Sequence, residues 1–248
     1  MSNVLFYPHE SCSISLINEH VSEPIKASSY IPPWFKNAPR FQNNEKEMFI
    51  NEDGSYHNLT VRHCMPFLDA MTSGYFLTTW TDIHVKRNNG EVFISYDNQD
   101  AVNRFGYGLV QYQKYFQSHV PTVKGYDPFL YAWSTYWRIK TDPGVSCLFT
   151  QPLNHTESPF LTLSGVIDTD NWSGSDVLNF AFKKDFEGTI PKGTPYVQII
   201  PFKREEWNLK ISKSIDHSAS ELRNTVSKSR LDSQSGYYRD NLWNKKGY

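Results

Sequence analysis

The sequence predicts a mainly β protein, a distorted barrel or sandwich preceded by an extended N-terminal arm and followed by a C-terminal amphipathic helix. Aromatic residues make up 15% of the 248 residues, and large aromatic side chains are enriched in strands. Between residues 61 and 202, short apolar runs such as GYFLTTW (74–80), EVFISY (91–96) and FLTLSGVID (160–168) are separated by turn residues. Several short strands at this spacing are typical of an all-β fold.

Three segments are expected: an N-terminal arm over 1–60, a β core over 61–202 and a helical tail over 203–248. The arm contains SYIPPWFKNAPR (29–40), whose three prolines fix φ and remove donors, so it is expected to run extended. Trp34 and Phe35 are interpreted as packing anchors of this arm rather than as ligand platforms. Inside the core, the Asn-Gly pair of VKRNNGEV (85–92) predicts a β-hairpin.

The tail shows helical spacing of apolar residues. These residues are Trp207, Ile211, Ile215, Ala219, Leu222 and Val226. Steps of three or four residues predict an amphipathic helix. Charges of both signs lie between them, which favours a docking or oligomerisation element over a membrane helix.

The charge and cysteine content exclude several classes of function. The net charge of −1 gives no strong nucleic-acid signal. No apolar run of about 18 residues and no leader pattern are found, so we expect a cytoplasmic protein without a membrane partner. Cys12, Cys64 and Cys147 form no CxxC pair, which indicates reduced thiols. Cys64 and Cys147 are interpreted as apolar fillers rather than nucleophiles.

Three motifs follow one another in the second half of the predicted core: GVSCLF (144–149), GVID (165–168) with a further Asp at 170, and KGTPYVQII (192–200). Their order within residues 65–202 resembles the core of the dUTPase and dCTP deaminase superfamily. The resemblance implies a β-clip barrel, commonly a homotrimer with sites shared between subunits. It also implies a catalytic Asp168, nucleotide-binding Ser146, Asp170, Trp172 and Gln198, and Mg²⁺ only where a nucleotide is hydrolysed.

The sequence departs from the family's pattern at the positions that bind phosphate and metal in that family. Val145 and Pro195 stand where the family has arginines, and Phe76 stands where it has an acid. Asn171 takes the place of the stacking aromatic, with Trp172 one residue later. The family's Gly-rich C-terminal lid is absent from the sequence. Hydrolysis of a triphosphate needs cations to offset its charge, so these replacements predict lost catalysis.

Two functions are therefore expected from different classes. The first is a non-catalytic structural or interaction module, a homo-oligomer that reaches protein partners through its arm or tail. The combination of a dUTPase-like core with unfamiliar flanks also looks similar to uncharacterised proteins of tailed bacteriophages, which would place the chain in the host cytoplasm. The alternative is a nucleotide-binding protein or divergent nucleoside triphosphate pyrophosphatase that uses Asp168. In a third interpretation, Asp168 and Asp170 have no functional role and only accept hydrogen bonds from the backbone amides of their own turn.

A metal site is a weaker hypothesis. His155 and Glu157 have the spacing of an iron-binding pair, and His217 is the candidate third ligand. Because His217 falls in the predicted tail helix, we expect no metal site of this kind. The sequence contains no Gly-x-Ser-x-Gly elbow and no phosphate-cradling Gly-Lys-Ser/Thr loop.

Overall fold

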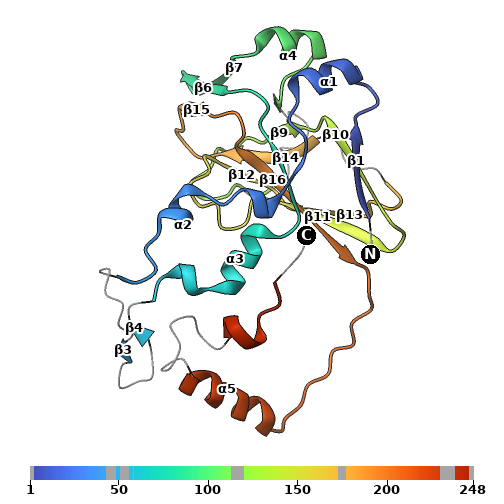
Figure 1. Cartoon of the computed structure of the whole chain (residues 1–248). Coiled ribbons are helices and arrows are strands. Elements are labelled where there is room, and N and C mark those ends of the chain that lie inside the picture. Colours follow the sequence, from blue (N-terminus) through green and yellow to red (C-terminus); the bar gives the residue numbers. More distant parts are fainter. Residues whose placement is uncertain are drawn as a thin grey trace. The chain divides into compact units, whose positions relative to one another are not determined.

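The chain forms two units in the computed structural model (Figure 1). The structure describes residues 3–42, 49–50, 56–57, 59–112, 120–172, 177–229 and 238–245. Unit 1 consists of Met1–Ser29 and Gly74–Arg204, and unit 2 of Tyr30–Ser73 and Glu205–Tyr248. This division by contacts differs from the three consecutive segments expected from the sequence, because each unit is assembled from two separate stretches of the chain.

Unit 1 is built of antiparallel sheets. Its strands are β1 Val4–Pro8, β2 Ile25–Lys26, β5 Tyr75–Thr78, β6 Ile83–Asn88, β7 Glu91–Tyr96, β8 Val110–Tyr112, β9 Tyr131–Ser134, β10 Trp137–Thr141, β11 Val145–Thr150, β12 Phe160–Thr162, β13 Gly165–Ile167, β14 Val177–Phe182, β15 Gly188–Ile190 and β16 Pro195–Lys203. Three helical segments accompany them: α1 Ile14–His20, η1 Ala27–Ser29 and α4 Gln99–Phe105.

The described strands of unit 1 form four sheets and do not close into one barrel. The largest has the order β13-β11-β16-β5-β2, and a second has the order β12-β14-β9-β8. Smaller sheets pair β15-β6-β7 and β1-β10. The mainly β prediction is confirmed, whereas the single distorted barrel is replaced by separate sheets.

Two strands near the N-terminus, β1 and β2, belong to these sheets. β1 pairs with β10, from Val4 opposite Thr141 to Pro8 opposite Trp137. β2 pairs with β5, with Ile25 opposite Phe76. The first half of the N-terminal arm expected over residues 1–60 thus contributes two strands to unit 1, whose backbone groups are satisfied by ladder hydrogen bonds.

The predicted hairpin is present between β6 and β7. Asn88 pairs with Glu91, which leaves a two-residue loop. The loop residues have positive φ, 50° at Asn89 and 82° at Gly90. Positive φ at both central residues is what a tight hairpin turn of the favoured twist requires, and Asn-Gly supplies it at little cost. The hairpin prediction is confirmed.

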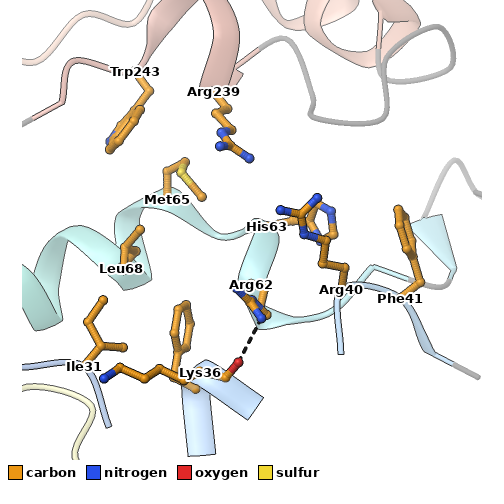
Figure 2. Close-up of a pocket in the computed structure, with 11 residues that line it drawn as sticks. Ile31, Lys36, Arg40, Phe41, Arg62, His63, Met65, Leu68, Arg239 and Trp243 are labelled. Atoms are coloured by element: carbon orange, nitrogen blue, oxygen red, sulfur yellow. Dashed lines mark hydrogen bonds between the residues drawn. The ribbon is translucent and has the colours of Figure 1, made fainter. Parts of the chain in front are cut away.

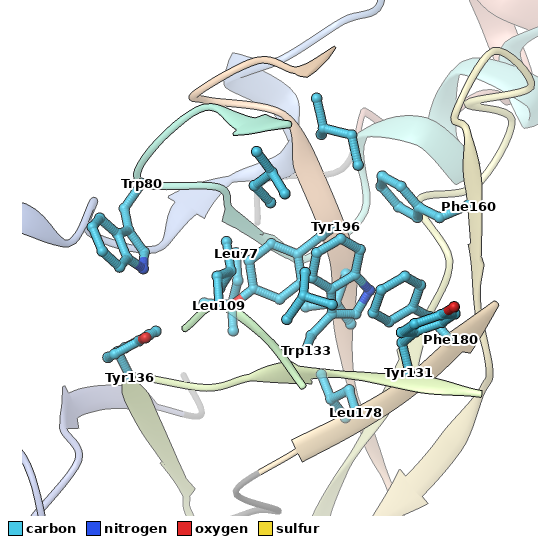
Figure 3. Close-up of a cluster of buried hydrophobic side chains, with 14 of the residues drawn as sticks. Leu77, Trp80, Leu109, Tyr131, Trp133, Tyr136, Phe160, Leu178, Phe180 and Tyr196 are labelled. Carbon is cyan, nitrogen blue, oxygen red and sulfur yellow. The ribbon is translucent and has the colours of Figure 1, made fainter. Parts of the chain in front are cut away.

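The core of unit 1 is aromatic (Figure 3). The fully buried ring of Trp133 stacks on Phe180 with centroids 3.9 Å apart. Its edge meets Phe160 at 4.9 Å. The indole nitrogen of Trp133 donates a hydrogen bond of 3.0 Å to Oγ1 of Thr162, so the buried polar group is satisfied. The high aromatic content of the sequence therefore serves packing.

A glycine allows two strands of the largest sheet to approach closely. Gly74 precedes β5 and has a φ of +71°. A Cβ at this position would lie 2.0 Å from the carbonyl oxygen of Ile199 in β16. Such a distance is far inside van der Waals contact, so no residue with a side chain fits without moving the strands.

Unit 2 contains short helices and one small strand pair. Its elements are α2 Pro33–Asn37, β3 Phe49–Ile50, β4 Tyr56–His57, η3 Val61–His63, α3 Met65–Thr72, α5 His217–Ser229 and η4 Tyr238–Leu242. The proline-rich segment, expected to be extended, contains the helical turn α2. Pro33 is compatible with this turn because it occupies the first helical position, where a missing N–H costs nothing.

The two aromatic residues of α2 pack together with a third ring. Trp34 meets Phe35 edge-on at 5.6 Å and Phe67 of α3 at 6.0 Å. Phe35 and Phe67 are stacked 6.2 Å apart. These contacts agree with the interpretation of Trp34 and Phe35 as packing anchors.

The tail helix begins ten residues later than its apolar spacing predicts. α5 covers only His217–Ser229, and the connection from β16 to α5 carries no helix (Figure 1). Oδ1 of Asp216 accepts hydrogen bonds from the amides of Ser218 at 3.0 Å and Ala219 at 3.2 Å. A side-chain acceptor of this kind caps a helix and fixes its start. Within the described ranges, no helix has the length and apolar composition needed to cross a bilayer.

Candidate functional site

The acid loop, residues 168–172, follows strand β13 in unit 1. β13 pairs with β11, with Ile167 opposite Cys147. This register brings Ser146, the second residue of β11, beside the loop, and its Oγ donates a 2.6 Å hydrogen bond to Oδ1 of Asp168. The amides of Asn171 and Trp172 donate to the carbonyl oxygen of Asp168 at 3.0 and 2.9 Å. The loop is therefore a closed turn, tied to β11 by the serine.

Arg204, which the sequence motifs did not predict, forms a cluster with Ser146, Asp168 and Asp170. Arg204 follows β16, which pairs with β11 on the side opposite β13. Its Nη1 donates to Oγ of Ser146 at 3.0 Å and to Oδ1 of Asp170 at 2.8 Å. The same Nη1 lies 3.3 Å from Oδ1 of Asp168. Nη2 of Arg204 forms a second hydrogen bond, to Oδ2 of Asp170.

The charges of this cluster compensate each other. Arg204, and next the amide of Gly144 at 2.8 Å, hold the pKa of Asp170 well below its ordinary value. The hydrogen bond to Asp170 in turn raises the pKa of Arg204. The Asp170 side chain is only 7% exposed, and a buried carboxylate needs such a partner. The guanidinium is thereby occupied by groups of its own chain.

Two of the predicted site residues face solvent. The side chain of Asp168 is 57% exposed, and Trp172 is 65% exposed. Trp172 thus contributes little to the core, and its ring is accessible beside the acid loop. A half-exposed carboxylate near an accessible aromatic ring is a geometry that a ligand can reach.

Gln198 is placed differently from the other predicted site residues. It is fully buried in β16, opposite Phe76 of β5. Its Oε1 accepts a hydrogen bond of 2.8 Å from the amide of Leu153. The side chain therefore braces the segment after β11, and its hydrogen bond lies away from the acid loop. Phe76, which stands where the resembled family has an acid, is a fully buried core residue.

The metal hypothesis receives no support from the geometry. His155 is buried with its ring 5.5 Å from that of Phe76, and burial lowers its pKa to about 4. His217 begins α5 in unit 2. Among the residues that the structure describes, no three His, Cys, Asp or Glu side chains cluster as a metal centre would require.

The cysteines are free thiols. Cys147 is fully buried, and burial raises the pKa of its thiol. Its Sγ accepts a hydrogen bond of 3.3 Å from Oγ1 of Thr169. Because a thiol kept protonated is a poor nucleophile, Cys147 acts as a small core residue.

Comparison with known proteins adds little to this geometry. No protein-family model matches the sequence. No curated protein matches it either. Among solved structures, the chain is similar to a mutant dUTPase from phage phi11 of S. aureus that coordinates a structural Mg(II) ion. The identity is 11% and the TM-score 0.24, over 42% of this chain and 95% of that chain. So distant a likeness carries no argument about the site.

Sequence reasoning missed Arg204 because nothing around it forms a motif. It stands 34 residues from Asp170 and 58 from Ser146 along the chain. The only available signal was its position directly after a long apolar strand, PYVQIIPFK, whose pairing partner was not known from the sequence. The antiparallel register of β11 and β16 is what delivers it to the acid loop.

Proposed function

We propose that the protein is a non-catalytic interaction module that associates through its tail, in the first place with copies of itself. The observation that carries the proposal is the exposure of segment 207–215, which follows β16. Trp207 is 86% exposed, Leu209 87%, Ile211 79% and Ile215 74%. Four large apolar side chains open to water in one short segment are typical of an interaction site.

The pattern of this segment suits strand addition. Trp207, Leu209 and Ile211 alternate with Asn208 and Lys210, and no regular element is assigned there. Alternation with period two places the apolar side chains on one face of an extended strand. An extended segment of this kind can add to the free edge of a sheet through main-chain hydrogen bonds.

Unit 1 offers such an edge. Among the described strands, β7 lies at the edge of the sheet β15-β6-β7; it is six residues long and carries Phe93, which is 51% exposed. A donor segment and an acceptor edge on the same chain make two copies complementary to each other. Lys210 in the donor and Glu91 in the acceptor strand have opposite charge, which favours the pairing.

The acid loop supports a non-catalytic role. Phosphoryl transfer depends on cations that face the substrate and stabilise developing charge. The cation at this loop, Arg204, is bonded to Ser146 and Asp170. A substrate phosphate would have to displace a bidentate carboxylate to reach it.

Light scattering after size exclusion tests self-association with the full chain of 28.8 kDa. We expect a multiple of this mass for the native chain and the monomer mass for the variant Trp207→Ser/Leu209→Ser/Ile211→Ser. The control Asn208→Ser changes the opposite face of the same segment without altering its charge and is expected to keep the native mass. A native chain that stays monomeric at every concentration would overturn the proposal.

The second candidate, nucleotide binding or hydrolysis at Asp168, is favoured by the exposure of Asp168 and Trp172. Pyrophosphate release from nucleoside triphosphates with Mg²⁺ decides between the two candidates. We expect no release above background. Release that is abolished in Asp168→Asn would replace the interaction proposal with a hydrolase. A thermal-shift panel adds a test of binding alone, since a ligand at a hundred times its Kd stabilises by about 2.7 kcal/mol.

A further inference from the structure

Unit 2 contains a cavity of about 500 Å³ that has no counterpart in the sequence motifs (Figure 2). Its walls come from four places in the chain: α2 and its flanks, η3, the start of α3, and η4. A volume of this size lies within the range of small-molecule sites, roughly 300–1,000 Å³.

One wall of the cavity is apolar. It includes Phe35 of α2, Met65 and Leu68 of α3, and Trp243 just after η4. The indole nitrogen of Trp243 donates a 2.9 Å hydrogen bond to Oδ2 of Asp69. This bond fixes the ring, so an apolar surface is already formed without a ligand.

The other side of the cavity is cationic. Lys36, Arg40, Arg62 and Arg239 contribute to the lining, and none of the described lining residues is acidic. Arg62 is held in place because its Nη1 donates to the carbonyl oxygens of Lys36 at 2.9 Å and Ala38 at 3.3 Å, both of them uncharged groups. Its positive charge therefore remains uncompensated by this anchoring.

Arg40 and Arg239 make no ion pair with any residue in the described part of the chain. Both guanidinium groups lie near His63 in Figure 2. Burial, and next the charge of Arg40, lower the pKa of His63, and Arg239 and Arg62 act in the same direction. The buried Nδ1 of His63 has no hydrogen-bond partner among the described residues. The arginine charges around His63 therefore give the cavity a cationic face, which attracts an anionic ligand group.

We propose that this cavity binds a small molecule that carries a phosphate group on an aromatic or aliphatic body. Arginine guanidinium groups match phosphate oxygens in pairs, and no residue that the structure describes bonds the guanidinium groups of Arg40 and Arg239. Trp243, Met65 and Leu68 then contact the body of the ligand. A nucleoside monophosphate and a phospholipid headgroup share this chemistry. The site lies wholly within unit 2 and does not depend on the tail segment 207–215.

Isothermal titration of the full-length chain tests the site. The probes are adenosine monophosphate, adenosine, inorganic phosphate and dihexanoyl phosphatidic acid, so that the nucleotide and lipid sources are separated. The test variant is Arg40→Gln/Arg239→Gln. The control is Arg223→Gln, which removes the same charge from the exposed helix α5 of the same unit.

We expect one of the two phosphate-bearing organic probes to bind more tightly than adenosine and inorganic phosphate. In the double variant its affinity falls about tenfold or more, because charge-assisted hydrogen bonds are lost, while the control keeps the native affinity. Equal binding by the double variant, or equal binding of adenosine, would overturn the proposal. The absence of binding by all four probes would overturn it as well.

Proton NMR of the His63 ring gives an independent reading. A bound phosphate offsets the charges of the arginines, so the pKa of His63 rises when the ligand is added. The native chain with and without ligand is compared with the double variant, in which the ligand leaves the pKa of His63 unchanged. A ligand that binds without moving the pKa of His63 occupies another place and contradicts the assignment.

Discussion

Two charged clusters in this chain differ in whether their arginines are paired with carboxylates. At the acid loop of unit 1, the guanidinium of Arg204 is bonded to Ser146 and Asp170. In the cavity of unit 2, Arg40 and Arg239 face no described carboxylate. The first arrangement stabilises the fold, and the second leaves charge available for a ligand. We therefore propose that the acid loop stabilises the fold, and we expect the binding site in the cavity of unit 2, where the sequence shows no motif.

The largest expected effect on stability comes from the close approach of Gly74 to β16, the strand that precedes Arg204. In Gly74→Ala the new Cβ would lie 2.0 Å from the carbonyl oxygen of Ile199, so β5 and β16 must separate. We expect a loss of about 3 kcal/mol or more in the free energy of unfolding, measured by denaturant titration.

Gly90→Ala is the matched control, because Gly90 also has positive φ but nothing lies within 4 Å of an added Cβ. It is expected to lose only about 1 kcal/mol from backbone strain. Equal losses in the two variants would show that close approach at Gly74 contributes nothing.

Removal of the paired cation is the next largest effect. Arg204→Met leaves Asp170, at 7% exposure, with an uncompensated charge. We expect the Tm at neutral pH to fall by several degrees in differential scanning calorimetry. Lys203→Met removes the same charge from the neighbouring exposed residue and is expected to leave the Tm within experimental scatter. A Tm unchanged in both variants would show that the pairing of Arg204 with Asp170 does not stabilise the fold.

The loss of Tm in Arg204→Met is expected to depend on pH. Because Arg204 depresses the pKa of Asp170, the stabilisation is complete above the ordinary value of 3.8 and is lost as the pH falls below it. The difference in Tm between the native chain and Arg204→Met should therefore be largest at neutral pH and shrink below pH 4. Glu10, whose pKa Arg138 lowers to about 2, titrates equally in both proteins and cancels from the difference. A difference that grows as the pH falls would contradict the assignment.

Removal of Arg40 should have the smallest effect on the Tm. Arg40→Gln breaks no ion pair among the described residues, so the Tm is expected to stay the same or rise slightly. The pKa of His63 should rise in this variant, since Arg40 is the charge that lowers it most. NMR titration of the His63 ring measures this change, with Arg223→Gln as the control. A clear fall in Tm would show that Arg40 supports the fold and would remove the contrast with Arg204.

The parts of the fold that depend on local pattern could be predicted from the sequence. The β class followed from short apolar runs, and the hairpin at Asn89 and Gly90 followed from the positive φ that those residues tolerate. The tail was predicted less well, because the step from Trp207 to Ile211 fits both a helical turn and an alternating strand. The cap at Asp216 decides where the helix starts.

The sites depend on long-range pairing, which no local pattern reveals. Arg204 reaches the acid loop only because β16 pairs with β11 in one register. The cavity of unit 2 combines residues 31–41, 62–68, 239 and 243. No single window of the sequence holds enough of these residues to indicate a site.

One titration compares the two clusters most directly. The phosphate-bearing probe that binds the native chain is titrated into Arg204→Met and into Arg40→Gln/Arg239→Gln under the same conditions. We expect native affinity in Arg204→Met and a loss of about tenfold or more in the double variant. Loss of binding in Arg204→Met, with native affinity in the double variant, would contradict the account and return the binding site to the acid loop.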